Sequence, residues 1–257
     1  MHQIVSRGCC RTGLILLAAF ALHAQDARQI MEESQKRTRA NSQQYEGLLQ
    51  VIEPSGKTTE KRWQSQRLGS FGNSKTMLRF TAPAEVKGVA LLVMNHTDRA
   101  ADEWMWTPAI GRERRIALQD RSTRFFGTDF TFEDLEERDV EQFDFKLLGD
   151  GEIDGAKCWK IESTPRKGKT SQYSLLQMWV RKDNYVTAQM DCYSKDQLVR
   201  RLKYQQIEDV QNIWTARVLE MSDLKRKSRT ILKLEQLRYN VPLKDDEFTV
   251  AGLQREK

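Results

Sequence analysis

Residues 172–193 read QYSLLQMWVRKDNYVTAQMDCY, and this stretch decides the fold. Two apolar-rich segments, at 172–181 and 185–193, flank a short polar turn at 182–184. Segments of this length, separated by Asp and Asn, predict two antiparallel strands joined by a hairpin. The stretch therefore indicates an antiparallel sheet rather than a helical bundle.

The same rhythm of short strands and turns extends over most of the 257-residue chain. Strands do not alternate with long helical segments, so a parallel α/β sheet is not expected. The pattern favours one continuous antiparallel sheet that curls into a partial or full barrel. About a dozen strands are predicted, near residues 44–53, 58–68, 75–82, 88–95, 102–107, 112–118, 143–149, 156–164, 172–181, 185–193, 197–207, 213–222 and 228–240.

Two helices are expected to interrupt this meander. Residues 26–40 carry apolar side chains at helical spacing, with Asp26 in position to cap the first turn. Residues 128–139 give the second helix, because Thr131 and the acidic residue three positions later have the spacing of a capping box. The acidic residues of 133–141 alternate with an arginine there and are expected to form a solvated face.

Some of the predicted strands are apolar on both faces. Residues 88–95 read GVALLVMN, and residues 175–180 read LLQMWV. A single antiparallel sheet needs only one apolar face, so other elements must cover the second one. The two helices are the expected covers. The apolar interior that they would close could be a solid core or a cavity.

The N-terminal segment has the features of an export signal. Arg7 and Arg11 precede the apolar run at 14–22, and small residues follow it. This run is about half of the ~20 residues that a membrane-spanning helix needs. We expect cleavage after Ala24, with Ala21 as the alternative, which divides the chain into a signal peptide at 1–24 and one domain at 25–257. The mature chain is expected in the periplasm, without a transmembrane segment.

Two cysteines, Cys158 and Cys192, remain after cleavage. The predicted meander places them on strands that are separated by a third strand. Two strand spacings exceed the ~7 Å between Cα atoms that a disulfide bond allows. We therefore predict no intramolecular disulfide.

The sequence offers no arrangement of residues that is typical of catalysis or metal binding. His96 lies in a turn, and neither a nucleophile elbow nor a phosphate-binding glycine loop is present. Residues 150–155 resemble half of a calcium loop, but Ile161 occupies the position of the bidentate glutamate, which indicates a plain hairpin turn. The net charge of +6 is well mixed, and the basic run at 225–229 is expected at a hairpin tip. We predict a protein that is not an enzyme, with no cofactor, no metal and no nucleic-acid partner.

Several stretches resemble the bacterial family of outer-membrane lipoprotein-sorting proteins, which includes the carrier LolA and its receptor LolB. The resemblance follows the order of the chain and covers essentially all of the mature sequence. It rests on TPAIGRERRI at 107–116, FGTDFTFEDL at 126–135, WVRKDNY at 179–185, YSKDQL at 193–198, NIWT at 212–215, and YNVPL with FT between 239 and 249.

This resemblance implies a mainly β fold with an α-helical lid: an unclosed antiparallel β-barrel of about 11 strands around an apolar cavity that helices cover. It also implies a monomeric periplasmic carrier that binds acyl chains of a lipoprotein or lipid and moves them towards the outer membrane. An inner-membrane lipid exporter and an outer-membrane acceptor would then be partners. The alternative is an envelope-stress sensor or pump-accessory module, similar to the LolA-like domain of RseB, that binds a protein or lipopolysaccharide.

Two groups of residues are candidates for ligand contact in such a cavity. The predicted lining consists of apolar side chains of the doubly apolar strands and their neighbours: Leu78, Phe80, Leu92, Met94, Trp104, Trp106, Met178 and Met190. The predicted rim consists of Arg112, Arg114 and Arg115, which could meet anionic headgroups. A solvated strand face is the alternative for these arginines.

Overall fold

The structure, a computed structural model, describes residues 16–255. The basic residues and first cysteines of the predicted signal peptide lie outside the described residues. One α-helix, α1 (Leu16–Arg37), precedes a continuous run of strands. Among the described residues, no helix combines the length and the apolar character that a membrane span needs.

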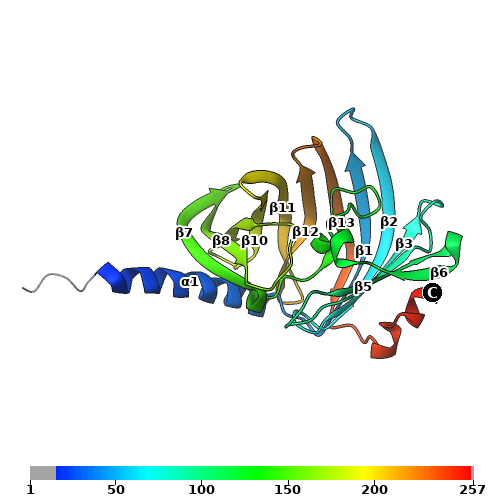
Figure 1. Cartoon of the computed structure of the whole chain (residues 1–257), viewed down its shortest axis with the longest axis horizontal. Coiled ribbons are helices and arrows are strands. Elements are labelled where there is room, and N and C mark those ends of the chain that lie inside the picture. Colours follow the sequence, from blue (N-terminus) through cyan, green and yellow to red (C-terminus); the bar gives the residue numbers. More distant parts are fainter. Residues whose placement is uncertain (1–15, 256–257) are drawn as a thin grey trace, which may run out of the picture.

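Thirteen strands form one antiparallel sheet, as the meander predicts. Its order is β6-β5-β4-β3-β2-β1-β13-β12-β11-β10-β9-β8-β7, and β6 and β7 are its two ends, so the barrel is unclosed (Figure 1). The count agrees with the thirteen ranges read from the sequence and exceeds by two the number of about 11 that the family resemblance implies. The strands are β1 (Ser42–Ile52), β2 (Thr58–Leu68), β3 (Lys75–Ala82), β4 (Ala90–Met94), β5 (Asp102–Thr107), β6 (Arg112–Arg115), β7 (Phe143–Ile153), β8 (Ala156–Pro165), β9 (Leu175–Arg181), β10 (Thr187–Ser194), β11 (Gln197–Val210), β12 (Ile213–Asp223) and β13 (Ser228–Tyr239).

The turns between the strands follow the sequence signals. In the β7–β8 hairpin, Asp154 and Gly155 both have positive φ, at 48° and 79°. This is the geometry that an Asp-Gly turn favours, so the half calcium motif is a hairpin turn, as predicted. The basic run at 225–229 likewise lies at a hairpin tip: residues 225–227 are in the turn between β12 and β13, and β13 begins at Ser228.

Residues 128–139 do not form the predicted α-helix. They hold one 3₁₀ turn, η3 (Glu133–Leu135), and a second turn, η4 (Val140–Gln142), follows. The carboxylate of Asp134 does accept bonds from the backbone N–H and the hydroxyl of Thr131, both at 2.8 Å. The capping-box spacing therefore predicted the local contact, but the chain turns only once before it leads to β7.

Most of the acidic side chains of this segment are buried or half-buried and only Glu141 is exposed, so the predicted solvated face is wrong. Glu133, Glu136 and Asp139 are each less than a tenth exposed. The segment from β6 to β7 connects the two ends of the sheet across its inner side (Figure 1), and aromatic side chains embed it there. Partners compensate the buried charge: Glu133, for example, accepts from the Ser171 hydroxyl and from the Gln172 backbone N–H at 2.9 Å.

Helix α1 lies along β7 and η4 at one end of the sheet (Figure 1). Ala27, Ile30 and Met31 form its buried face, which agrees with the predicted helical spacing. The helix begins at Leu16, so position 26, the predicted start, lies inside it. The carbonyl oxygen of Gln35 accepts from Thr38, and its side-chain oxygen accepts from the backbone N–H of Val140 over 3.0 Å, which fastens the end of the helix to η4.

Strand β4 is buried on both faces, as its sequence predicts. Leu91 and Val93 belong to the inner core, whereas Leu92 belongs to a smaller cluster on the outer face. The prediction that a helix covers this second face is wrong. The C-terminal segment covers it with Phe248 and Leu253, around η5 (Asp245–Glu247) and η6 (Ala251–Gln254) (Figure 1).

Both cysteines of the described chain are free and buried, which confirms the prediction. Cys158 lies on β8 and Cys192 on β10, and β9 separates these strands.

Candidate functional site

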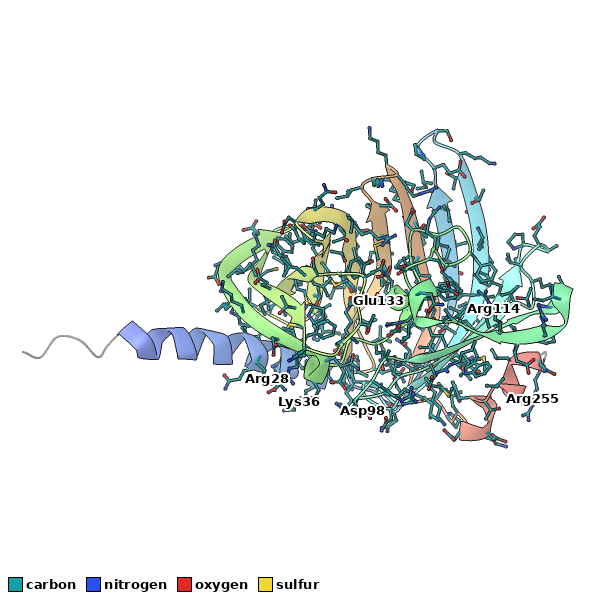
Figure 2. The ribbon with its side chains drawn as sticks, in the orientation of Figure 1. Arg28, Lys36, Asp98, Arg114, Glu133 and Arg255 are labelled. Atoms are coloured by element: carbon teal, nitrogen blue, oxygen red, sulfur yellow. The ribbon has the colours of Figure 1, made fainter. Side chains whose placement is uncertain are left out.

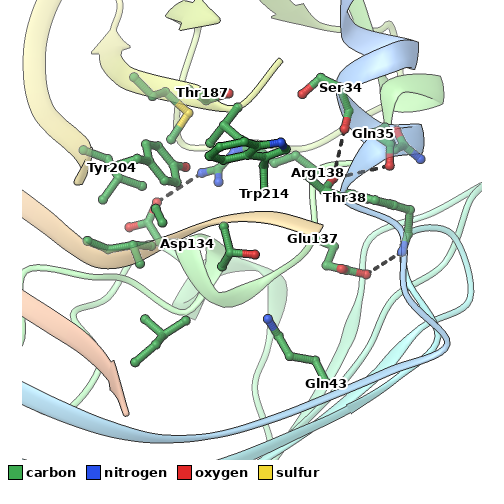
Figure 3. Close-up of a pocket in the computed structure, with 18 of the residues that line it drawn as sticks. Ser34, Gln35, Thr38, Gln43, Asp134, Glu137, Arg138, Thr187, Tyr204 and Trp214 are labelled. Carbon is green, nitrogen blue, oxygen red and sulfur yellow. Dashed lines mark hydrogen bonds and ion pairs between the residues drawn. The ribbon is translucent and has the colours of Figure 1, made fainter. Parts of the chain in front are cut away.

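A cavity of about 410 Å³ lies on the inner side of the curled sheet (Figure 3). Its volume lies within the range of about 300–1,000 Å³ that small-molecule sites have. Strands β9–β13, helix α1 and the segment between β6 and β7 all contribute to its wall. Three side chains of α1 face it, Met31, Ser34 and Gln35, together with Thr38 directly after the helix.

The strand side of the cavity is mainly apolar, with polar side chains such as Gln43 of β1 and Thr187 of β10 among its lining. Alternate residues of a strand share a face, and Leu232 and Leu234 of β13 both point inward for this reason. Met190 of β10 pairs with Met178 of β9 and with Leu202 of β11, so the three side chains lie next to one another across the sheet. Trp214, at the start of β12, also lines the cavity and is 41% exposed, which places it at the boundary with solvent.

Asp134 and Arg138 bring charge into this wall. Besides its bonds from Thr131, the Asp134 carboxylate accepts from the Tyr173 hydroxyl over 3.0 Å. The Arg138 guanidinium lies 3.3 Å from the same carboxylate. Burial disfavours the charged guanidinium, but the Asp134 carboxylate holds the pKa of Arg138 above its usual value. Arg138 therefore carries a full positive charge beside an apolar wall.

Tyr204 of β11 faces the same region. Burial raises the pKa of its phenol to about 12. The hydroxyl thus stays protonated at neutral pH and can donate a hydrogen bond.

A second ion pair closes the cavity near the loop between β2 and β3. Arg67 donates to Glu137 over 2.5 Å, and Glu137 also accepts from the backbone N–H of Phe71 over 2.6 Å and from the Ser74 hydroxyl. Glu137 is thereby bound to several groups of the β2–β3 region, and Figure 3 shows its position at the cavity.

A buried carboxyl pair adjoins the cavity. Arg121 donates to Glu136 over 2.5 Å, and Glu103 of β5 is a close neighbour of Glu136. Burial, together with the Glu136 carboxylate, raises the pKa of Glu103 well above its usual value, so Glu103 holds its proton at neutral pH. Sequence reasoning missed this pair. The available signal was the position of Glu103, which pairs across the sheet with the inward-facing Val93.

The structure separates the predicted lining residues into three groups. Met178 and Met190 line the cavity. Leu78 and Phe80 lie in the inner core on β3, where Phe80 stacks on Phe125. The remaining four residues belong to the outer cluster under the C-terminal segment and do not line the cavity: Leu92, Met94, Trp104 and Trp106.

The three predicted rim arginines lie together on β6, at the end of the sheet away from α1 (Figure 2). All three are exposed, and none lines the cavity. Arg115 forms an ion pair with Asp102. The headgroup-binding role of Arg112, Arg114 and Arg115 stays a prediction.

The fold is similar to that of several solved structures. A putative outer membrane lipoprotein-sorting protein domain from Vibrio parahaemolyticus has a TM-score of 0.86 at 24% identity, over 90% of this chain and 100% of that one. A DUF1329 family protein from Desulfovibrio piger has a TM-score of 0.86 at 28% identity, over 90% and 99%. A LolA superfamily protein from Nitrosomonas europaea has a TM-score of 0.69 at 21% identity, over 87% and 97%. The LolA-like fold is thus confirmed.

A family model described as "Uncharacterized protein" matches residues 72–255, which is more than half of the chain. The chain belongs to this family. No curated protein sequence matches it.

Proposed function

We propose that the protein is a periplasmic carrier that holds acyl chains of a lipid or lipoprotein in the cavity and moves them towards the outer membrane. The observation that carries the proposal is the apolar wall inside a LolA-like sheet, formed by side chains such as Met178, Met190 and Leu232. Burial of one CH₂ group is worth about 0.8 kcal/mol, so one long chain would be held firmly. The proposal assigns binding to the site and not catalysis.

The route of transfer follows from this role. The export signal predicted at 1–24 would bring the chain to the periplasm. There an inner-membrane lipid exporter would load the cavity, and an outer-membrane acceptor would empty it. Release needs an acceptor of higher affinity or a more open state of the cavity. The partly exposed Trp214 marks where a chain would enter.

The test is to purify the mature chain from periplasm without detergent and to record its native mass spectrum. We expect additional mass that extracts into chloroform. Leu219 lines the cavity, so Leu219→Trp should fill it and remove most of that mass. Leu224→Trp is the matched control, because Leu224 is 40% exposed in the β12–β13 turn.

A bare protein mass for the wild type would contradict carriage of a resident lipid. A stable protein partner in place of lipid would favour the sensor alternative instead. Equal lipid content in Leu219→Trp and in the wild type would show that the chains lie elsewhere.

A further inference from the structure

The cavity contains hydrogen-bond donors that the protein itself does not use. Arg138 has five N–H donors, and among the described residues its one hydrogen bond goes to Asp134 over the long distance of 3.3 Å. The Tyr204 hydroxyl lies close enough to interact electrostatically with this guanidinium. Figure 3 shows Arg138 and Tyr204 directed toward the same part of the cavity. We call these two side chains the donor corner.

Asp134 does not depend on Arg138 for its hydrogen bonds. Its carboxylate already accepts two bonds from Thr131 at 2.8 Å and one from Tyr173 at 3.0 Å. Arg200 supports the same group, because it donates to the Tyr173 hydroxyl over 3.2 Å. Most of the N–H groups of the Arg138 guanidinium therefore remain available to a second acceptor.

The other charged groups at the cavity are already paired. Arg67 is bound to Glu137 and to the Ser70 hydroxyl. Glu136 is bound by Arg121. Among the described lining residues, Arg138 is the cation whose donors face the apolar cavity while its one ion pair, with Asp134, spans 3.3 Å and uses a single N–H.

The apolar part of the cavity wall indicates what kind of group could be attached to an acceptor that binds at the donor corner. Met178, Met190 and Leu202 form an apolar surface of the same cavity. A planar guanidinium binds the paired oxygens of a carboxylate or phosphate in a bidentate manner. A volume of about 410 Å³ suits one ligand of modest size.

We propose that the donor corner binds the anionic headgroup, a carboxylate or a phosphate monoester, of a single-chain acidic lipid whose acyl chain lies along the apolar wall. This inference rests on the proposed carrier function and names its cargo class. It places headgroup recognition inside the cavity, at Arg138, and not at the exposed arginines of β6.

The first test uses the delipidated wild-type chain and three probes of matched chain length: hexadecanoate, palmitoyl lysophosphatidate and 1-hexadecanol. Their affinities are measured by displacement of a neutral fluorescent reporter at pH 7.5. We expect at least one of the two anions to bind at least tenfold more tightly than the alcohol, which corresponds to 1.4 kcal/mol. The anion that binds more tightly identifies carboxylate or phosphate as the natural headgroup.

The second test removes the charge. Arg138→Gln should lose at least tenfold in affinity for the preferred anion and keep its affinity for 1-hexadecanol. Arg138→Lys should keep part of the preference, and Tyr204→Phe should weaken anion binding by a smaller factor. Arg114→Gln is the matched control on β6 and should behave as the wild type.

Each outcome separates this inference from the carrier proposal. Equal affinity of the wild type for the anions and the alcohol overturns the inference while the carrier function stands. Loss of anion preference in Arg114→Gln, with retention in Arg138→Gln, moves recognition to the exposed rim and also overturns it. Absence of binding for all three probes overturns the carrier function itself.

Discussion

Gly47 is a position where one added methyl group should cost considerable stability. It pairs across the sheet with Trp63 of β2, and the indole lies over its Cα. A Cβ at position 47 would lie 2.0 Å from Trp63 Nε1 and 2.4 Å from its Cδ1. The indole cannot move aside, because Trp63 is 1% exposed and packs on Phe80 and Phe125 with ring centroids 5.7 and 6.0 Å away.

Overpacking of this kind costs about 1–3 kcal/mol. The upper end applies to Gly47→Ala, because backbone and ring must both shift. About 3 kcal/mol lowers the melting temperature of a domain of this size by roughly 6–12 °C. Thermal and urea unfolding, followed by tryptophan fluorescence and circular dichroism, measure this directly.

Gly151→Ala is the matched control, because its Cβ would meet Trp179 at 3.2 Å and that ring is only partly buried. This variant should be nearly neutral. In a double-mutant cycle, Gly47→Ala should lower the free energy of unfolding less in the Trp63→Phe background than in the wild type, because the smaller ring leaves room for the methyl group. A Gly47→Ala protein as stable as the wild type would refute the packing argument.

Two further predictions concern the buried carboxyl pair and the outer cluster. Because Glu103 has a raised pKa in the folded state, the unfolded chain loses this proton first, and the group lowers stability as pH rises above about 4.5. Glu103→Gln should therefore lose less stability than the wild type between pH 5 and 8 in urea unfolding; equal losses would contradict this. Leu92→Ala should cost about 2–5 kcal/mol while lipid content stays unchanged, since Leu92 is fully buried on the outer face; lost lipid would place the ligand there.

The sequence predicted the strands because their signals are local. Turn residues such as Asp154 and Gly155 require particular backbone angles wherever they occur. Gly47 shows the limit of such signals, because a lone strand glycine indicates a close approach but not its partner. The pairing with Trp63 becomes visible only in the register of β1 and β2.

The site was harder to predict because it depends on contacts between distant segments. Met178 and Met190 of the predicted lining lie on the cavity side, whereas the sequence could not say which face of the doubly apolar β4 points inward. The sequence alone predicts a solvated acidic segment, because Arg121, the partner that compensates the buried Glu136, lies 15 residues upstream and outside the segment. Arg138 was missed for the same reason, since its exposure depends on the whole curl of the sheet.

Photo-crosslinking tests the central claim most directly. The protein is loaded with hexadecanoic acid that carries a diazirine along its chain, and it is then irradiated, digested and mapped by mass spectrometry. The account predicts adducts on the inner strands, at or beside Met178, Met190 and Leu202. Adducts confined to the outer cluster around Leu92 and Trp104 would contradict it.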